Sequence, residues 1–287
     1  MNLKQKWLAG SAVVLMGLGS TAYGSTLIGG NAADFNSATN ILDIVFVIDT
    51  SGSMADNSLA ISNTASAAIT ALNCPDDVWV RARFMGITNV EPGTIFDERM
   101  TTVLAGNALV SNSSEDNGPA VTDLSNFYPW FSGGEFDAPG NSTAGKTLYK
   151  AVVTIGDEGT ENGQPVVQSD WDAALVANAA AIANDVFLFA WATDTTNALV
   201  APLFQSMAEG GGPPVASFTG GNCSDTGGAF IDGTAGQTTA QVTATLQDII
   251  CTAGGGGTGG GGVPVPAPLA LLGVGLLGLG LRRHFFA

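Results

Sequence analysis

A strand that ends in a carboxylate and two hydroxyls constrains this chain more than any other feature. Residues 44–48 form an unbroken apolar run, which is typical of a strand covered on both faces in a parallel sheet. Asp49 follows at once, and Ser51 and Ser53 come next. A segment rich in Ala, Ile and Leu, residues 58–72, is then predicted to be a helix. The order of strand, polar turn and helix indicates an open α/β sheet, in which ligands bind at such turns.

The oxygen side chains of this turn suit a hard divalent cation, which prefers carboxylate, hydroxyl and water ligands. The arrangement Asp-x-Ser-x-Ser after an apolar strand resembles the metal-ion-dependent adhesion site, or MIDAS, of von Willebrand factor type A domains. The resemblance implies a doubly wound, mostly parallel α/β sheet flanked by helices. It also implies that Asp49, Ser51 and Ser53 hold Mg²⁺, Mn²⁺ or Ca²⁺. An ion with few charged ligands can bind a further carboxylate, so the implied partner is a protein or a polysaccharide that offers one.

A second acidic turn follows the apolar strand predicted over residues 148–155. In the resembling family the fourth strand ends in a Thr-Asp-Gly-type motif whose Asp contributes to the metal site, and Asp157 occupies that place here. Gly156 stands where the family has Thr and Glu158 where it has Gly. The resemblance therefore implies Asp157 as a further ligand, with a shift of one position to Glu158 as the alternative.

The third loop of the resembling site is the least well matched. Family members carry a Thr, or in integrin β-like relatives a Glu, ahead of the fourth strand and separated from it by a helix. That helix is predicted to be shortened or absent here, which leaves Thr143 as the first choice of ligand and Asp137 as the second. Asp56 and Asn57 fall where integrin β-like relatives carry a second-metal pair, and the alternative is that they are ordinary residues of a helix N-terminus.

The first 24 residues have the pattern of a secretory signal. Two lysines precede an apolar core, residues 8–18, and Ala22-Tyr23-Gly24 is a small-x-small site of the kind that a signal peptidase cleaves. The apolar run is too short for a helix that spans a bilayer of about 30 Å. We therefore expect an exported chain that begins near Ser25.

The other end of the chain has three parts in order. Residues 254–262 are eight glycines and one threonine, a flexible linker. Residues 263–287 comprise Val-Pro-Val-Pro, an apolar stretch and a basic end. This tail resembles the PEP-CTERM sorting signal of exopolysaccharide-producing Gram-negative bacteria, although Val265 stands where that family has Glu. The resemblance implies transient membrane association, an exosortase-type processing enzyme and a place at the cell surface or in the extracellular matrix. The alternative is a plain hydrophobic anchor.

Between these ends, residues 25–253 have a length that suits one α/β domain. Four of the nine basic residues and none of the 25 acidic ones lie in the end segments, which leaves five basic residues and a formal charge of −20 for the domain. Such a domain repels nucleic acid and anionic membrane surfaces and attracts divalent cations.

The three cysteines are too few and too far apart for a zinc site, whose ligands usually come in close pairs. In the expected fold, Cys74, Cys223 and Cys251 all lie at the edge of the sheet opposite the metal. One disulfide is expected there. Cys223–Cys251 is the simplest pairing and Cys74–Cys251 is the alternative.

The rest of the chain supplies further elements of an α/β sheet, and residues 91–146 show the poorest pattern. Strands are predicted over 78–90, 186–192 and 229–231, with a short one over 101–104, and helices over 169–183, with Ser169 as the N-cap, over 199–209 and over 237–251.

The sequence does not favour an enzyme. The only histidine, His284, lies in the C-terminal tail, and no cysteine or serine has a recognisable base beside it. We expect an exported surface or matrix protein that binds its ligand through the metal ion. Two alternatives stay open: a matrix protein whose cation is only structural, and a hydrolase that cleaves exopolysaccharide through acids such as Asp157 and Glu158.

Overall fold

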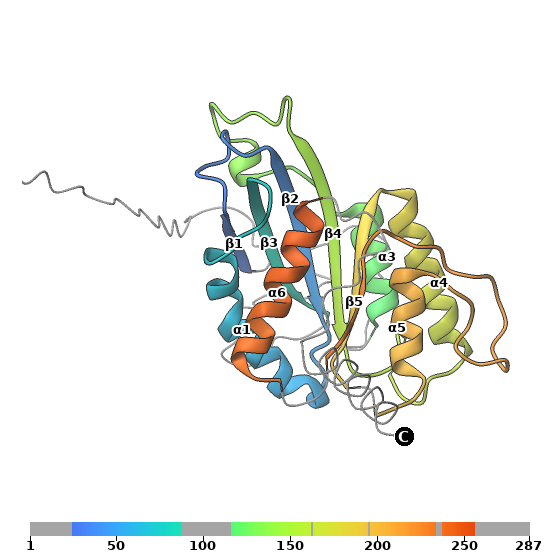
Figure 1. Ribbon diagram of the computed structural model, residues 1–287. Helices are drawn as coiled ribbons and strands as arrows, with labels where there is room; N and C mark the ends of the chain where they lie inside the picture. Colours follow the sequence, from blue (N-terminus) through green and yellow to red (C-terminus); the bar gives the residue numbers. More distant parts are fainter. Residues whose placement is uncertain (1–24, 88–115, 162, 195, 234–236, 256–287) are drawn as a thin grey trace, which may run out of the picture.

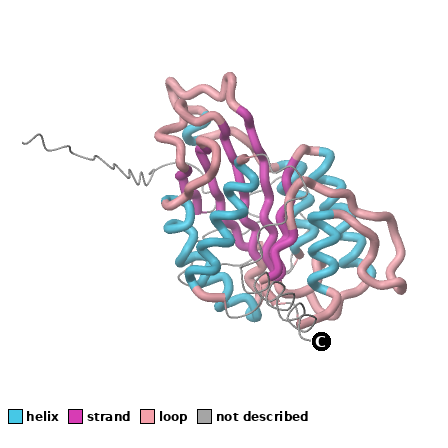
Figure 2. Tube along the Cα trace, viewed as in Figure 1, coloured by secondary structure: helices cyan, strands magenta, loops and turns pink. Residues whose placement is uncertain are grey.

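The computed structural model describes residues 25–87, 116–161, 163–194, 196–233 and 237–255. In these ranges the chain forms one six-stranded sheet between two layers of helices, as Figures 1 and 2 show. Five strands run parallel, and the first strand runs antiparallel to its neighbour. The predicted fold class, a doubly wound and mostly parallel α/β sheet flanked by helices, is confirmed.

The strand order across the sheet is β1-β3-β2-β4-β5-β6. The bounds are β1 Ser25–Gly30, β2 Asn40–Ile48, β3 Val78–Gly86, β4 Thr147–Gly156, β5 Val186–Ala192 and β6 Phe230–Asp232.

Strand β2 lies at the centre because both of its faces are apolar. All nine of its residues are buried, and β3 and β4 flank it in parallel register. Alternate residues of a strand point to opposite faces. Accordingly Leu42, Ile44, Phe46 and Ile48 enter one hydrophobic core, whereas Val45 and Val47 enter the other. This central strand delivers Asp49 to the carboxyl edge of the sheet.

The described helices cover both faces of the sheet (Figure 1). On the first face, α1 and α6 pack together over the core that contains Phe46. On the second face, α3, α4 and α5 pack in sequence over the core that contains Val45. The helix bounds are α1 Ala55–Thr70, α3 Asn117–Phe127, α4 Gln168–Ala183, α5 Val200–Glu209 and α6 Thr239–Gly254.

Two elements of the described chain differ from the sequence-based expectation. Helix α3 lies ahead of β4, where we expected a helix that was shortened or absent. Pro119 is in its first turn, where the missing N–H of proline is not needed by the helix. Strand β1 was not predicted at all, and it forms one edge of the sheet beside β3.

The observed bounds of the remaining elements agree closely with the predicted ones, but the predicted N-cap residue of one helix was wrong. Helix α4 begins at Gln168, one residue before the predicted N-cap Ser169, and Val167 is the N-cap. The carboxylate of Asp170 accepts a hydrogen bond from the N–H of Val167, which secures this helix start. Strand β3 ends at Gly86 rather than at residue 90. Residues 88–90 and the predicted strand 101–104 lie outside the described residues.

A buried ion pair ties the central strands to the loop that leads into β4. Arg81 and Asp43 are both buried, and the guanidinium of Arg81 pairs with the carboxylate of Asp43. Arg81 also donates to the carbonyl of Ser132, and its guanidinium lies over the ring of Phe136. The loop is thereby fixed over the amino-terminal part of the sheet, because Phe136 also contacts Trp79 near the start of β3.

The disulfide joins Cys74 and Cys251, so the simpler pairing Cys223–Cys251 was wrong. Cys74 follows α1, and Cys251 lies in the last turn of α6. These two helices are neighbours on one face of the sheet, whereas Cys223 belongs to the core on the other face. Cys223 is a buried free thiol, and burial raises its pKa to about 11.

Among the described helices, none has the length and apolar character needed to cross a bilayer.

Candidate functional site

The candidate site lies at the carboxyl edge of the sheet, where β2 and β4 end side by side. Asp49 is the first residue after β2, and its side chain is fully buried. Its backbone N–H donates to the carbonyl of Ile155 at 2.9 Å, which extends the pairing of β2 with β4 by one residue. Asp49 is therefore held by the sheet itself, and the strand fixes where its carboxylate lies.

The two serines follow in a tight turn that leads into α1. Oδ1 of Asp49 accepts a hydrogen bond from the backbone N–H of Ser51 at 2.7 Å. The hydroxyls of Ser51 and Ser53 lie 2.8 Å apart. Ser51 is buried and Ser53 is exposed, so this row of oxygens runs from the end of the strand to the surface.

The second strand end brings Asp157 to the same place. Asp157 directly follows β4, and its Oδ1 accepts a hydrogen bond from Ser53 Oγ at 3.3 Å. The acid that contacts the serine turn is thus the first of the pair Asp157 and Glu158. Burial raises the pKa of Asp157, the hydrogen bond from Ser53 acts in the opposite direction, and the charge of Asp194 raises it further. A cation at this point would favour the charged carboxylate.

Thr143 does not lie at this site. It precedes β4, and the segment that contains it is bonded to residues that precede β2: the N–H of Ser142 donates to Oδ1 of Asn36, and the N–H of Thr147 donates to the carbonyl of Thr39. Because β2 and β4 are parallel, Thr143 lies at the amino edge of the sheet. The length of a nine-residue strand, about 25–30 Å, separates it from Asp49.

Asp137, the second choice, is also away from the site. It follows the short helix Gly134–Phe136, and its Oδ2 accepts a hydrogen bond from the N–H of Gly133. This is the loop that Arg81 fixes over the amino-terminal part of the sheet. Neither Thr143 nor Asp137 lies at the site, and the reason is the same for both. Each belongs to the segment that leads into β4, and such a segment lies at the amino end of a parallel strand, whereas the site lies at the carboxyl end.

Asp56 and Asn57 lie in the first turn of α1, close to the site. Asp56 is exposed, and Nδ2 of Asn57 lies 3.5 Å from Oγ1 of Thr193. Thr193 follows β5, and its N–H donates to the carbonyl of Gly156. These contacts connect the start of α1 with the ends of β4 and β5.

The structure places Asp116, an acid that the sequence analysis did not name, at the carboxyl edge of the sheet. Asp116 is the N-cap residue of α3 and is buried. The next residue, Asn117, accepts a hydrogen bond from Thr154 Oγ1 at 2.7 Å, and the N–H of Gly118 donates to the carbonyl of Thr160. The N-terminus of α3 therefore packs against the carboxyl end of β4. The signal that could have found it is an acid one residue before a helix that precedes the fourth strand.

The oxygen atoms of the turn fit a hard divalent cation. Hydroxyls of Ser51 and Ser53 and carboxylates of Asp49 and Asp157 come from two loops at adjacent strand ends, and such a mixed set suits Mg²⁺, Mn²⁺ or Ca²⁺. Within the ranges that the structure describes, no group of three or more His, Cys, Asp or Glu side chains is placed to hold a metal ion. Any ion here would thus depend on the serine hydroxyls as well as on the acids.

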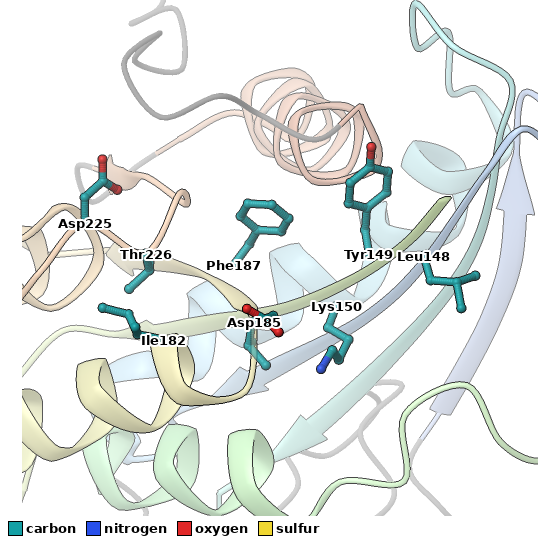
Figure 3. Close-up of a pocket in the computed structure, with 9 residues that line it drawn as sticks. Leu148, Tyr149, Lys150, Ile182, Asp185, Phe187, Asp225 and Thr226 are labelled. Carbon is teal, nitrogen blue, oxygen red and sulfur yellow. The ribbon is translucent and has the colours of Figure 1, made fainter. Parts of the chain in front are cut away.

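A cavity of about 360 Å³ lies at the amino ends of β4 and β5, away from the candidate site. In Figure 3, Tyr149 and Phe187 lie on one side of the sheet, and Lys150 lies on the other, where its ammonium donates to the carbonyl of Asn184. The cavity is therefore lined by residues on both faces of the sheet, at the amino edge and thus at the opposite edge from Asp49.

No known protein family matches this sequence, and no curated protein is significantly similar to it. The solved structures that are similar to it include two of proximal thread matrix protein 1 (PTMP1) from the mussel byssus, one with a zinc-occupied MIDAS motif and one in a second crystal form. The identities are 11% and 12%, with a TM-score of 0.35 in both cases. The similarity covers 79% of this chain and 48% of the PTMP1 chain, so this chain spans about half the length of that protein. Similarity at this level assigns neither a function nor a metal to this chain.

Proposed function

We propose that this protein binds a carboxylate-bearing protein or polysaccharide through a divalent metal ion at the carboxyl edge of its sheet. The observation that supports this most directly is the contact of Ser53 with Asp157, which joins two strand-end loops into one oxygen-lined site. Asp49, Ser51, Ser53 and Asp157 would be ligands of Mg²⁺, Mn²⁺ or Ca²⁺. When bound, the ion would supply positive charge for the partner's carboxylate.

We propose Asp116 in place of Thr143 as the contribution of the third loop, through a water molecule rather than as a direct ligand, because no three described acids are placed to hold one ion together. Asp116 is a buried carboxylate beside the carboxyl end of β4, where it is already shielded from bulk water. Thr143, by contrast, lies at the amino edge of the sheet.

The exposure of Ser53 favours ligand binding over a purely structural cation. A structural ion needs a closed set of protein ligands, whereas an ion that captures a partner needs an open position on the surface side. Asp49 and Ser51 are buried behind the turn and Ser53 is exposed in front of it. This change from buried to exposed ligands supports the proposal that a partner can reach the ion.

The experiment that tests the function uses Asp49→Ala in the full-length protein. An ion held at one hundred times its dissociation constant stabilises the fold by about 2.7 kcal/mol. For a domain of this size that is a rise in Tm of about 5–11 °C. We expect this rise with Mn²⁺ or Mg²⁺ in the wild type and none in the variant, because Asp49 lies beyond the strand and removing it leaves the apolar core intact. Equal metal responses in the two proteins would place the ion elsewhere on this acidic surface and refute the site.

We further propose that the protein acts at the cell surface or in the extracellular matrix of a Gram-negative bacterium, after processing by an exosortase-type enzyme. The Cys74–Cys251 disulfide supports export, since disulfides persist in oxidising compartments. The tail sequence supports sorting. A chain that ends at Gly255 should be released into the medium, whereas the full chain should stay with the cell or matrix. Identical distributions of the two in fractionated cultures would contradict this assignment.

A further inference from the structure

The loop that follows β4 carries the candidate ligand Asp157 and ends where α4 begins at Gln168. It folds back on itself, since the N–H of Gly159 donates to the carbonyl of Gly163 at 3.3 Å. Strand β4 fixes the start of this loop. The rest of the loop is attached to Asp170, a fully buried acid in the first turn of α4 that is not among the proposed metal ligands.

The carboxylate of Asp170 binds two separate points of the loop. Its Oδ1 accepts a hydrogen bond from the N–H of Glu161 at 2.7 Å, and its Oδ2 accepts one from the N–H of Val167 at 2.7 Å. A third bond involves the main chain, because the hydroxyl of Thr160 donates to the carbonyl of Asp170. A carboxylate can accept from both N–H groups at once, whereas an amide of the same shape offers one acceptor oxygen. The acid is therefore matched to the two N–H groups that it binds.

Close packing places this carboxylate directly against the loop backbone. A Cβ atom built at Gly159 would lie 2.2 Å from Oδ1 of Asp170 and 2.5 Å from the carbonyl oxygen of Gly163. A residue with a side chain would therefore displace the carboxylate or the loop. Because Gly159 is two residues after Asp157, the carboxylate of Asp170 contacts the loop near the candidate ligand as well as at its two hydrogen-bond donors.

The same connection includes the start of α3. The carbonyl of Thr160 accepts a hydrogen bond from the N–H of Gly118 at 2.8 Å, while its hydroxyl binds Asp170. A Cβ atom built at Gly118 would lie 2.9 Å from Cβ of Ala173, so α3 and α4 are in close contact here, and they lie side by side in Figure 1. Asp116, the N-cap residue of α3, is two residues away. Asp170 is thus linked through Thr160 to both the loop after β4 and the start of α3.

We infer that Asp170 is a positioning residue of the metal site, which fixes Asp157 and Asp116 relative to the serine turn without contacting the ion. The serine turn follows the central strand and is held by the sheet, whereas Asp157 and Asp116 belong to two segments that Asp170 and Thr160 join. Groups that orient the ligands of a metal ion typically contribute about tenfold or more to its affinity. The inference rests on the proposed function, and it adds a residue that the pattern of ligands alone does not reveal.

The test measures the Mn²⁺ affinity of the full-length protein by EPR, which detects the free ion. Asp170→Asn keeps the shape of the side chain and replaces one acceptor oxygen by a donor, so one of the two loop N–H groups loses its partner. We expect Mn²⁺ to bind about tenfold more weakly. The bound Mn²⁺ should also carry more water, measured by water-proton relaxation, because a displaced Asp157 leaves its coordination position to water. A general loss of stability would not change the hydration of the bound ion.

A double-variant comparison shows whether Asp170 acts through Asp157. Groups that act as a unit have non-additive effects. Once Asp157→Ala has removed the ligand, adding Asp170→Asn should weaken Mn²⁺ binding by no more than about threefold, the part that acts through Asp116. The full tenfold loss on top of Asp157→Ala would show that Asp170 does not act through this ligand, and would overturn the inference.

Asn178→Ala is the matched control, on the same helix. Asn178 is also buried and also attaches α4 to the main chain of another segment. Its Nδ2 donates to the carbonyls of Met207 at 2.8 Å and Ser224 at 2.7 Å, and its Oδ1 accepts from the N–H of Ser224 at 2.9 Å. Its replacement should lower the Tm of the metal-free protein as Asp170→Asn does, but it should leave Mn²⁺ affinity within about twofold of the wild type.

The outcomes separate this inference from the function on which it rests. Unchanged Mn²⁺ affinity in Asp170→Asn, or equal losses of affinity in Asp170→Asn and Asn178→Ala, overturns the positioning role while the metal site stands. If Asp170→Asn does not fold, Thr160→Val decides, because it removes the hydroxyl that binds Asp170 and keeps the carbonyl that binds Gly118. It should weaken Mn²⁺ binding about threefold, and an unchanged affinity overturns the inference. A wild-type protein that does not bind Mn²⁺ refutes the proposed function itself.

Discussion

Ser53 and Asp157 are 104 residues apart in the sequence, and their side-chain oxygens lie 3.3 Å from each other. The contact arises because β2 and β4 are adjacent, parallel and in register over nine residue pairs, so the residues that follow each strand meet at one edge. Neither loop has to be long or specially shaped for this. The sheet alone aligns the two loops, which makes the site sensitive to which end of a strand a residue occupies.

The first prediction distinguishes the two candidates from the third loop. Asp116→Ala should weaken Mn²⁺ binding about tenfold, because it removes a carboxylate beside the carboxyl end of β4 that would act on the ion through water. Thr143→Ala, the matched control, should leave the affinity within about twofold of the wild type, because Thr143 lies at the amino edge. Isothermal titration with Mn²⁺ measures both. A loss of affinity in the Thr143 variant alone would contradict the strand register from which the site is built.

The second prediction concerns the disulfide. Removing the Cys74–Cys251 link, by the double change to Ser or by reductant, should lower the free energy of unfolding by about 2–5 kcal/mol. Cys223→Ala should cost less, because Cys223 is not cross-linked and alanine removes only one buried sulfur atom. Urea unfolding with and without reductant measures the difference. Reductant that destabilises the wild type and the double variant equally would show that this disulfide does not carry the effect.

The third prediction is a pH dependence that comes from α3. Asp123 is 6% exposed, and burial raises its pKa to about 6, above the value of about 3.9 for an unfolded chain. The folded state thus binds this proton more tightly than the unfolded state does. The resulting stabilisation is complete below pH ~4 and is lost as the pH rises through about 6.

Asp123→Asn removes this titration and keeps the shape of the side chain. The variant should gain stability relative to the wild type as the pH rises from 4 to 7, by about 1–3 kcal/mol in all. Urea unfolding of both proteins at several pH values measures the gap. A gap that stays constant across this range would mean that Asp123 has an ordinary pKa.

The sequence was sufficient for the parts of the site that follow buried strands. Asp49 and Asp157 each come directly after an apolar run, and a run of that kind must lie in the sheet, so the position of the next residue follows. The choice of Thr143 rested on the order of the loops along the chain. The position of a loop in space depends instead on the direction of the strand that the loop leads into, and β4 runs parallel to β2.

Asp116 was missed because the chain around it has the composition of a loop. Asn117, Gly118 and Pro119 open α3, and all three residue types are poor helix formers within a helix. At the start of a helix they are tolerated, and here the core that contains Val121 and Leu124 stabilises the helix that follows. Packing of this kind depends on residues far away in the sequence, which no local pattern reveals. The same holds for β1, a strand with two glycines that exists because β3 offers it an edge.

The disulfide also determines how the domain carries mechanical load. Cys251 is three residues from the end of α6, and its partner Cys74 lies just before β3. Tension applied to the chain beyond Gly255 therefore unwinds at most the last three residues of the helix before it reaches the cross-link. From there it passes through the sulfur atoms to the segment that enters β3, so the rest of α6 is not pulled away from the sheet. A domain tethered by its C-terminus could in this way withstand shear at its attachment point without exposing the core beneath α6.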